Sequence, residues 1–313
     1  MPGIVEFPKV VRDAVEEFGD LFASEPQRRH FAEYLTGLMV ADRKTVLGIH
    51  DEFARIRDQS CLNRFLTEVE WDVEALNERR IELLQKASET RFTDRGVIPI
   101  DDVLIDHDGK FIEDVGWLWD HAEHRNKIAH DYLIVHYVCS SGRHYPLQFR
   151  RFRKKDQCEL NGEPFQNHTA LFCQLVDWVS DRDIPGTFTF DSYFTCAENL
   201  NHIHSKKDRY GDPRAYVGDL KFNRKLESKG RSLKAEELAK TIPPEDKREI
   251  RQGDKRQWTC TLTVHIPEVN HKVRLLILWD KRRDKEPKKI LVTNRTTWEV
   301  IRILLAYRHR WTG

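Results

Sequence analysis

The sequence lacks the features that mark membrane and secreted proteins. No run of apolar residues approaches the roughly 18 residues of a membrane-spanning helix. The first residues, MPGIVEFPKVVRDAVEEFGD, place acids among the apolar positions, which is not the pattern of a signal peptide. The six cysteines form no C-x-x-C pair, which argues against a disulfide framework or a zinc ribbon. We therefore expect a cytoplasmic protein with no membrane partner.

A histidine-rich stretch follows residue 120, but it gives little support for a zinc site. His121 and His124 have the i, i+3 spacing that zinc ligands can adopt, and His130 follows nearby. Because no cysteine accompanies them, we assign no metal to these three residues.

The sequence also lacks a large excess of charge of either sign. The formal net charge is only +1, so the chain as a whole is not drawn towards nucleic acid. Cations nevertheless gather in three short stretches, at residues 150–155, 221–225 and 281–289. One such stretch alone is more often solvated surface than a binding site, but several together could form a groove that meets phosphates.

Residues 1 to about 92 have the apolar spacing of a series of helices. In SCLNRFLTEVEWD, Ser60 is a candidate N-cap, and apolar residues recur at helical spacing from Leu62 to Val69. Arg and Lys would occupy the outer faces of these helices. This composition suits a DNA-binding domain and equally suits a plain helical bundle.

The pattern changes near residue 96 to that of a mixed α/β sheet. Alternating apolar residues predict a strand at 96–106 and a hairpin at 129–152. A helix at 167–181, a strand at 186–195, a helix at 196–205 and a strand at 214–220 follow. A polar, charge-rich stretch at 226–257 resembles a partly helical insertion, and three more strands come after it. The segment 296–311 is apolar on nearly all sides and predicts a buried helix.

Two aspartates stand at strand ends within this region. Alternation places Asp102 on the same face as Ile98 and Ile100, with Asp101 on the opposite face. Asp191 ends the strand GTFTFD just before a turn into a helix, where open α/β sheets place their sites. Two carboxylates suit Mg²⁺, which takes its other ligands from water and phosphate oxygens. An Asp at a strand end is more often a turn former or a cap, so these two residues alone do not decide.

Pieces along the whole chain resemble the DDE transposases of bacterial insertion sequences. The pieces are SCLNRFLTEVEWDVEALNERRIELLQ, IDDVLID, AHDYLIVHYV, YPLQFRRF, FTFDSYFT, YVGDLKFNRK and YRHRW. The chain is similar to the group whose third acid lies in a Tyr-x2-Arg-x3-Glu-x6-Lys signature. Each piece alone is unspecific, but the combination is specific.

The resemblance implies a ribonuclease-H-like mixed sheet behind an N-terminal helical domain, with a β-rich insertion. It implies a helical DNA-binding domain at 1–92, the first part of the catalytic core at 93–225, the insertion at 226–292 and a core helix at 293–313. By the motif, Asp102 and Asp191 are the catalytic acids and hold two Mg²⁺ or Mn²⁺ ions, with Asp101 competing with Asp102. DNA contacts are expected from six residues: Lys221, Asn223, Arg224, Lys225, Tyr307 and Arg310.

The match to the signature stops before its glutamate. Tyr307 and Arg310 fit Tyr-x2-Arg, and the glutamate would fall at the position after Gly313. The resemblance therefore implies a copy truncated before the third acid, with weak metal affinity and little or no strand transfer by this chain alone.

Three functions remain possible from the sequence. The first is a transposase that cleaves the terminal inverted repeats of its element and joins them to target DNA, as a homodimer on paired ends in a prokaryotic cytoplasm, associated with the nucleoid. The second is a catalytically dead DNA-binding remnant that occupies the repeats and inhibits an intact transposase. The third is another ribonuclease-H-like nuclease, such as one acting on RNA–DNA hybrids.

Overall fold

The computed structural model describes residues 3–54, 58–107, 112–120, 123–228, 230–252 and 255–311. The chain divides into two compact units, residues 1–86 and 87–313. Among the described residues, no helix has the length and apolar character needed to cross a bilayer.

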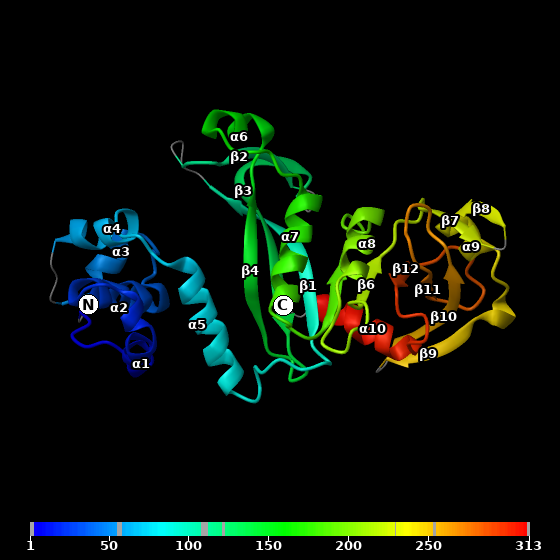
Figure 1. The fold of residues 1–313 in the computed structure, drawn as a ribbon, viewed down its shortest axis with the longest axis horizontal. Coiled ribbons are helices and arrows are strands. Elements are labelled where there is room, and N and C mark those ends of the chain that lie inside the picture. Colours follow the sequence, from blue (N-terminus) through cyan, green and yellow to red (C-terminus); the bar gives the residue numbers. More distant parts are fainter. Residues whose placement is uncertain are drawn as a thin grey trace. The chain divides into compact units, whose positions relative to one another are not determined.

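The first unit consists of short helices around an aromatic core. Phe22, Phe31 and Phe65 are buried together with Ile49. The ring of Trp71 packs against this core, and its Nε1 donates a hydrogen bond to the carbonyl of Phe65. The helices, labelled in Figure 1, are α1 (Lys9–Phe18), α2 (Glu25–Val40), α3 (Val46–Asp51), α4 (Gln59–Thr67) and α5 (Val73–Lys86), with a 3-10 turn at Gly19–Leu21.

The structure corrects the predicted start of α4. Asp58, not Ser60, is the N-cap, because its carboxylate accepts a hydrogen bond from the backbone nitrogen of Ser60 at 2.9 Å. Asp and Ser cap helices about equally well, so residue preference alone did not distinguish the two positions.

The second unit is built on a mixed sheet whose central strands run in the order β4-β3-β1-β5-β6. The strands β1, β3 and β4 pair antiparallel, whereas β1, β5 and β6 pair parallel. This arrangement confirms the predicted ribonuclease-H-like core. The strands are β1 (Val97–Asp106), β2 (Gly116–Asp120), β3 (Arg125–Val138), β4 (His144–Phe152), β5 (Thr187–Phe190) and β6 (Tyr216–Asp219).

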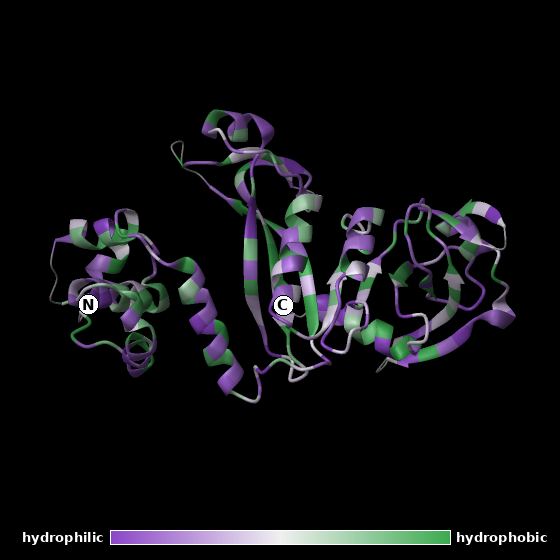
Figure 2. Cartoon of the chain, in the orientation of Figure 1, coloured by the Kyte–Doolittle hydropathy of each residue, from purple (hydrophilic) through white to green (hydrophobic). Residues whose placement is uncertain are grey.

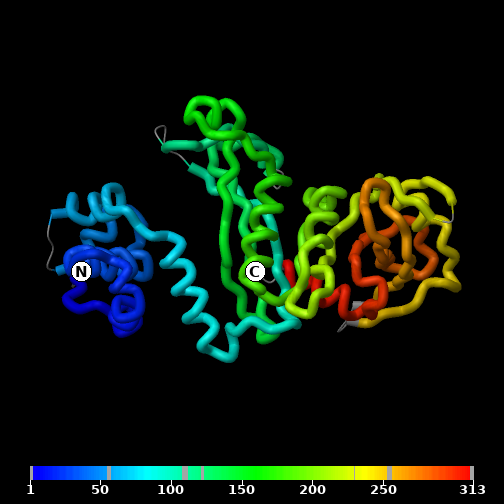
Figure 3. The backbone as a smooth tube through the Cα atoms, viewed as in Figure 1, coloured from blue at the N-terminus to red at the C-terminus, as the bar shows by residue number. Residues whose placement is uncertain are grey.

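A β-rich lobe extends the same sheet beyond β6. The last strand of the lobe pairs antiparallel with β6, and further strands continue the sheet outward. Figure 3 shows this lobe as the yellow and orange part of the tube. Its elements are β7 (Lys225–Ser228), β8 (Arg231–Lys234), α9 (Ala235–Lys240), a 3-10 turn at Pro244–Asp246, β9 (Arg248–Gln252), β10 (Lys255–Val264), β11 (Val273–Trp279) and β12 (Lys289–Thr293). The predicted partly helical segment therefore also contains short strands.

Helices cover both faces of the sheet around its centre. Phe172 of α7 packs on Phe190 of β5, on the face that α8 also covers. On the opposite face, Val97 and Val217 are buried with Ile303 of α10. The remaining helices are α6 (Lys155–Asn161), α7 (His168–Asp181), α8 (Ala197–Ser205) and α10 (Val300–Arg308), followed by a 3-10 turn at His309–Trp311.

The helix α10 is buried on one face only, which corrects the prediction of a helix buried on all sides. Ile303 and Leu304 lie in the core, but Ile301 and Leu305 are 53% and 45% exposed. Figure 2 colours much of the α10 ribbon green, the colour of hydrophobic residues. Its sequence is apolar all round, but in the described chain the sheet covers only one of its faces.

A neutral histidine pair joins α8 to the sheet. The rings of His204 and His271 stack with centroids 3.7 Å apart, and the hydroxyl of Tyr216 lies 2.8 Å from Nε2 of His271, within hydrogen-bond distance. Burial, with smaller contributions from His204 and His265, lowers the pKa of His271 to about 4. Because this pKa lies below neutral pH, His271 is neutral there, and its Nε2 can accept from the hydroxyl of Tyr216.

This pair predicts a loss of stability in acid. Because the pKa of His271 is about 4 when folded and 6.5 in the reference state, the unfolded chain binds the extra proton between these pH values. The free energy of unfolding should therefore fall by about 2–3 kcal/mol as the pH drops from 6.5 to 4, since one pKa unit is worth about 1.4 kcal/mol. Urea unfolding of wild type and His271→Gln across this range measures it. Equal slopes for the two proteins would contradict the prediction.

Candidate functional site

The parallel pairing of β1 and β5 brings the predicted acids together at the C-terminal end of β5, with Asp101 and Asp102 within β1 and not at its end as expected. Pro99 lies opposite Thr189, so continuing the register by two residues brings Asp101 level with Asp191. Asp102 lies opposite Leu133 of β3, on the face that α7 covers. The two neighbouring aspartates of β1 therefore approach Asp191 from opposite faces of the strand.

A tight turn fixes the carboxylate of Asp191. Its Oδ1 accepts hydrogen bonds from the backbone nitrogens of Tyr193 at 2.9 Å and Phe194 at 3.4 Å. The hydroxyl of Thr195 lies 2.9 Å from the carbonyl of Asp191 and 2.6 Å from the carbonyl of Asp219, which ends β6. The turn after β5 is thus tied to the end of β6, and Asp191 is presented in a fixed position.

Asp101 forms an ion pair with the end of the last helical segment. Nη1 of Arg310 donates to its carboxylate at 2.8 Å, and the Arg310 side chain is only 4% exposed. Partial burial raises the pKa of Asp101, and the charge of Arg310 lowers it. The charges of Asp191 and Asp102 raise it again, and the net result is a pKa of about 6. Arg310 is therefore a counter-ion of the acid cluster in this structure.

Asp102 is exposed and belongs to a second group of polar side chains. Although the residue is exposed, the surrounding protein partly desolvates its carboxyl group, which raises the pKa of Asp102. The charges of Asp131 and Asp191 raise this pKa further. Asp131 is 5% exposed, and its Oδ2 lies 2.8 Å from Nε2 of His168 at the start of α7. Asp101 and Asp102 are each repelled by the charge of Asp191, and a bound cation would relieve this repulsion.

Tyr307 lies in the hydrophobic core beside another ion pair. It is 6% exposed, and its hydroxyl is 3.3 Å from Nζ of Lys289. That Nζ also binds the carboxylate of Asp219 at 3.0 Å. Burial opposes the charge on Lys289, but the bond to Asp219 raises its pKa overall. Tyr307 and Arg310, both predicted DNA contacts, are thus held by the protein itself here, and a DNA contact by either needs a rearrangement.

The four other predicted DNA contacts lie together next to Asp191. They line a cavity of about 400 Å³, here called the basic cavity, whose wall includes Ser192, Tyr193 and Glu268. Lys221, Asn223 and Lys225 are exposed, and Arg224 is half-buried. Tyr193 lines this cavity and is 55% exposed. Burial raises the pKa of its hydroxyl, and the charges of Asp102, Asp131 and Asp191 raise it further. The structure therefore places a cationic surface directly beside Asp191.

The acid cluster suits a hard cation by its chemistry. Aspartate oxygens are ligands that Mg²⁺ and Mn²⁺ prefer, and the mutual repulsion of Asp101, Asp102 and Asp191 would be relieved by a cation. Within the ranges that the structure describes, no three His, Cys, Asp or Glu side chains stand in metal-binding geometry. Two of these carboxylates could hold a cation that takes its remaining ligands from water and a phosphate.

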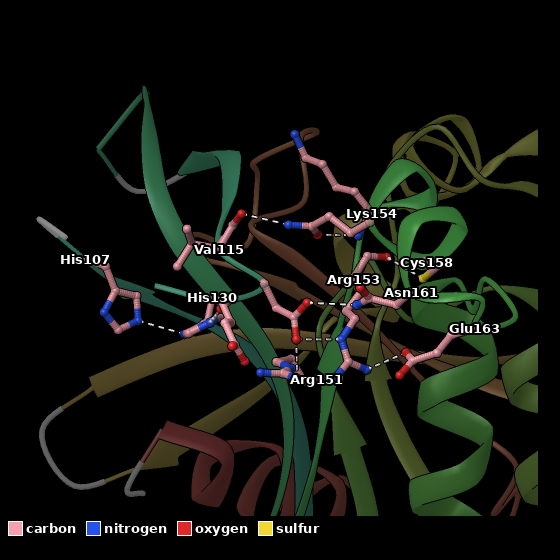
Figure 4. A network of polar contacts seen from close by, with 12 residues as sticks. His107, Val115, His130, Arg151, Arg153, Lys154, Cys158, Asn161 and Glu163 are labelled. Carbon is pink, nitrogen blue, oxygen red and sulfur yellow. Dashed lines mark hydrogen bonds and ion pairs between the residues drawn. The ribbon is translucent and has the colours of Figure 1, made fainter. Parts of the chain in front are cut away.

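The predicted histidine stretch shows a different arrangement. His121 lies outside the described residues, and His124 adopts a positive φ of 52°. Nε2 of His107 lies 2.8 Å from Nδ1 of His130 (Figure 4). Nε2 of His130 lies 2.7 Å from the carbonyl oxygen of Glu113. Arg151 and Arg153, both labelled in Figure 4, each form an ion pair with the carboxylate of Asp114.

Sequence reasoning missed several side chains of this region. Asp131 and His168 stand beside Asp102, and Lys289 joins Asp219 to Tyr307. Alternation along β3 does mark Asp131, because it falls among buried apolar positions where a carboxylate needs a partner. No local pattern marks Lys289, whose partners are distant in the chain.

Comparison with known proteins gives one family. Residues 17–260 match the family described as DDE superfamily endonuclease. This match covers both the helical unit from α1 onward and the acids of β1 and β5. No curated protein matches the sequence.

Proposed function

Because this chain belongs to the DDE superfamily of endonucleases, we propose that it is a transposase of an insertion sequence. Its substrate is double-stranded DNA, first at terminal inverted repeats and then at a target. The helical unit supplies recognition of the repeats, and two copies of the chain hold the paired ends. The observation that carries the proposal is the basic cavity, which places Lys221, Arg224 and Lys225 beside Asp191.

The residues have separate roles in this proposal. Asp102 and Asp191 bind Mg²⁺ or Mn²⁺ and are not nucleophiles. When bound, two such ions would activate the attacking oxygen and stabilise the leaving oxygen of an in-line displacement at phosphorus. The basic cavity holds the DNA backbone next to the acids, where phosphate contacts fix the register of the duplex.

Asp101 is the competitor of Asp102 for the metal. Asp101 lies level with Asp191 in the strand register, which favours it as the ligand. However, Arg310 already pairs with Asp101. Asp102 is exposed and has no ion pair among the described residues, which favours Asp102. We assign Asp102 to the metal and Asp101 to Arg310.

Neutralising the basic cavity should weaken DNA binding. We expect Lys221→Gln and Lys225→Gln each to reduce the slope of log K against log salt by about 0.9, because each removes one phosphate contact. Fluorescence anisotropy with a labelled duplex and EDTA present measures the slope. Lys272→Gln, an exposed lysine outside the cavity, is the control. Equal slopes for all three variants and wild type would contradict the role of the cavity.

A second candidate is a DNA-binding protein that does not cleave. The ion pair between Arg310 and Asp101 favours it, because a cation already neutralises part of the acid cluster. Incubating the chain with supercoiled DNA and Mg²⁺ or Mn²⁺ separates the two. Nicking that Asp191→Asn removes supports the transposase, whereas tight duplex binding without nicking supports the second candidate. Cleavage of an RNA–DNA hybrid in preference to duplex DNA would overturn both.

A further inference from the structure

A second charged cavity lies at the other end of β5 and β6 from the acids. It has a volume of about 280 Å³. It is lined by residues that precede these two strands, by the segment before α10 and by Arg302 of α10. Thr187 lines it at the first position of β5, four residues before Asp191. At about 3.3 Å per residue, the cavity is roughly 13 Å from Asp191 along the strand. It is therefore separate from the site described above. Four arginines line it: Arg209, Arg214, Arg295 and Arg302. We call it the arginine cavity.

Arg214 is a buried cation without a close counter-ion. Its side chain is among the largest fully buried ones, and the residue is 2% exposed. Its Nη2 donates to the carbonyl of Ile184 at 2.7 Å and its guanidinium lies over the ring of Phe188, but Nε has no hydrogen-bond partner. Asp208 and Asp183 attract its charge, but no ion pair within 4.0 Å joins Arg214 to either among the described residues, and burial lowers its pKa overall. Burying such a cation without an ion pair is costly, and an anion in the cavity would offset the cost.

Arg302 presents a planar guanidinium that is surrounded by like charge. It lies over the ring of Trp298, 3.9 Å from the centroid. Burial lowers its pKa, and the charges of Arg295 and Arg95 lower it further. Arg295 itself donates Nη2 to the carbonyl of Pro213 and leaves Nε without a partner. Cations that repel one another around a cavity favour a bound anion.

Four carboxylates also line the cavity, as many as the arginines, but two of them are in ion pairs and two are exposed. Asp94 pairs with Arg209 and accepts from the hydroxyl of Tyr210, and Asp208 lies 3.5 Å from Arg295. Asp183 and Asp212 are exposed. The charge that lacks a close partner is therefore that of Arg214 and Arg302.

We propose that the arginine cavity binds a phosphate group. Arginine donors in a fixed planar fork match the oxygens of a phosphate, and Trp298 holds one such fork in place. The phosphate belongs to a DNA backbone or is a free phosphate ion. In either case it is not the reacting phosphate, because the cavity lies at the opposite end of β5 from Asp191. The proposal does not depend on the acids.

The test compares two substitutions in α10 that differ in position only. Arg302→Ala removes the stacked guanidinium of the arginine cavity. Arg308→Ala removes an exposed arginine of the same helix that does not line the cavity. Alanine favours the helix in both cases. Arg295→Gln provides a second variant at the cavity. All measurements use the full chain with EDTA, so that metal at the acids plays no part.

Two probes distinguish the sources of the phosphate. The first probe is a labelled DNA duplex at about 50 to 200 mM salt. If the cavity binds the DNA backbone, Arg302→Ala should weaken duplex binding about tenfold and lower the slope of log K against log salt by about 0.9. Arg308→Ala should leave both quantities unchanged. For a free ion, inorganic phosphate should raise the unfolding temperature of wild type and not of Arg302→Ala, with duplex affinity unchanged. If duplex affinity and the phosphate-induced shift are the same in wild type, Arg302→Ala and Arg295→Gln, the proposal is wrong.

Discussion

Replacing Asp191 by asparagine should lower the affinity of this chain for Mn²⁺ by more than about tenfold while leaving its fold intact. Asparagine keeps an Oδ1 that accepts from the backbone nitrogens of Tyr193 and Phe194, so the turn is preserved. The substitution removes the negative charge that the cation needs. Loss of a group that only supports a ligand already costs about 10–100-fold in metal affinity, so loss of a ligand should cost at least as much.

The same measurement separates Asp101 from Asp102. If Asp102 is the ligand, Asp102→Asn should weaken Mn²⁺ binding as strongly as Asp191→Asn, and Asp101→Asn should have a small effect. Asp101→Asn leaves Arg310 without its carboxylate, so its main cost should be in stability. Water-proton relaxation during Mn²⁺ titration reports the affinity, and urea unfolding reports the stability.

A matched control and a clear contrary result are available. Asp280 follows β11, pairs with Lys288 on the surface and is far from the acids in the fold, so Asp280→Asn should change neither quantity. Strong loss with Asp101→Asn and none with Asp102→Asn would exchange the roles of the two residues. Unchanged Mn²⁺ affinity in Asp191→Asn would remove the metal site from the proposed function.

Local patterns were sufficient to predict the order of elements in the core. The alternation in GVIPIDDVLID and in the hairpin at 129–152 corresponds to β1, β3 and β4, because a strand half-buried by helices needs this period. The same alternation places Asp101 and Asp102 on opposite faces, as the register with β3 shows. Because β5 lies beside β1 in the strand order of the fold, Asp191 at the end of β5 also comes close to the aspartates of β1.

Contacts that join distant parts of the chain could not be predicted in this way. Arg310 meets Asp101 across 209 positions, and Lys289 meets Asp219 across 70. Such pairs depend on how α10 and β12 pack on the sheet, and no local period encodes that packing. The resemblance marked Tyr307 and Arg310 as DNA contacts, whereas packing places both against the protein. The arginine cavity has the same origin, because its residues come from the ends of separate elements.

Replacing Gly218 by alanine should destabilise the second unit and disturb Asp191 together. Gly218 lies in the middle of β6, opposite Phe190 of β5. A Cβ at this position would lie 2.5 Å from the ring of Phe190 and 2.9 Å from Oγ1 of Thr195. The ring cannot retreat, because Phe190 is fully buried between Phe172 and Tyr216. Overpacking of this kind costs about 1–3 kcal/mol.

The effect should extend to the metal because Thr195 ties the turn of Asp191 to β6. Displacing its hydroxyl lengthens the contacts to the carbonyls of Asp191 and Asp219, which are 2.9 Å and 2.6 Å in the structure. We therefore expect Gly218→Ala to lower the melting temperature by about 2–10 °C and to weaken Mn²⁺ binding as well. Gly116→Ala in β2 is the control, since its Cβ would meet neighbours only at 3.5 Å. Destabilisation with unchanged Mn²⁺ affinity would show that Thr195 does not position Asp191, and the absence of both effects would show that β5 and β6 can separate to admit the methyl group.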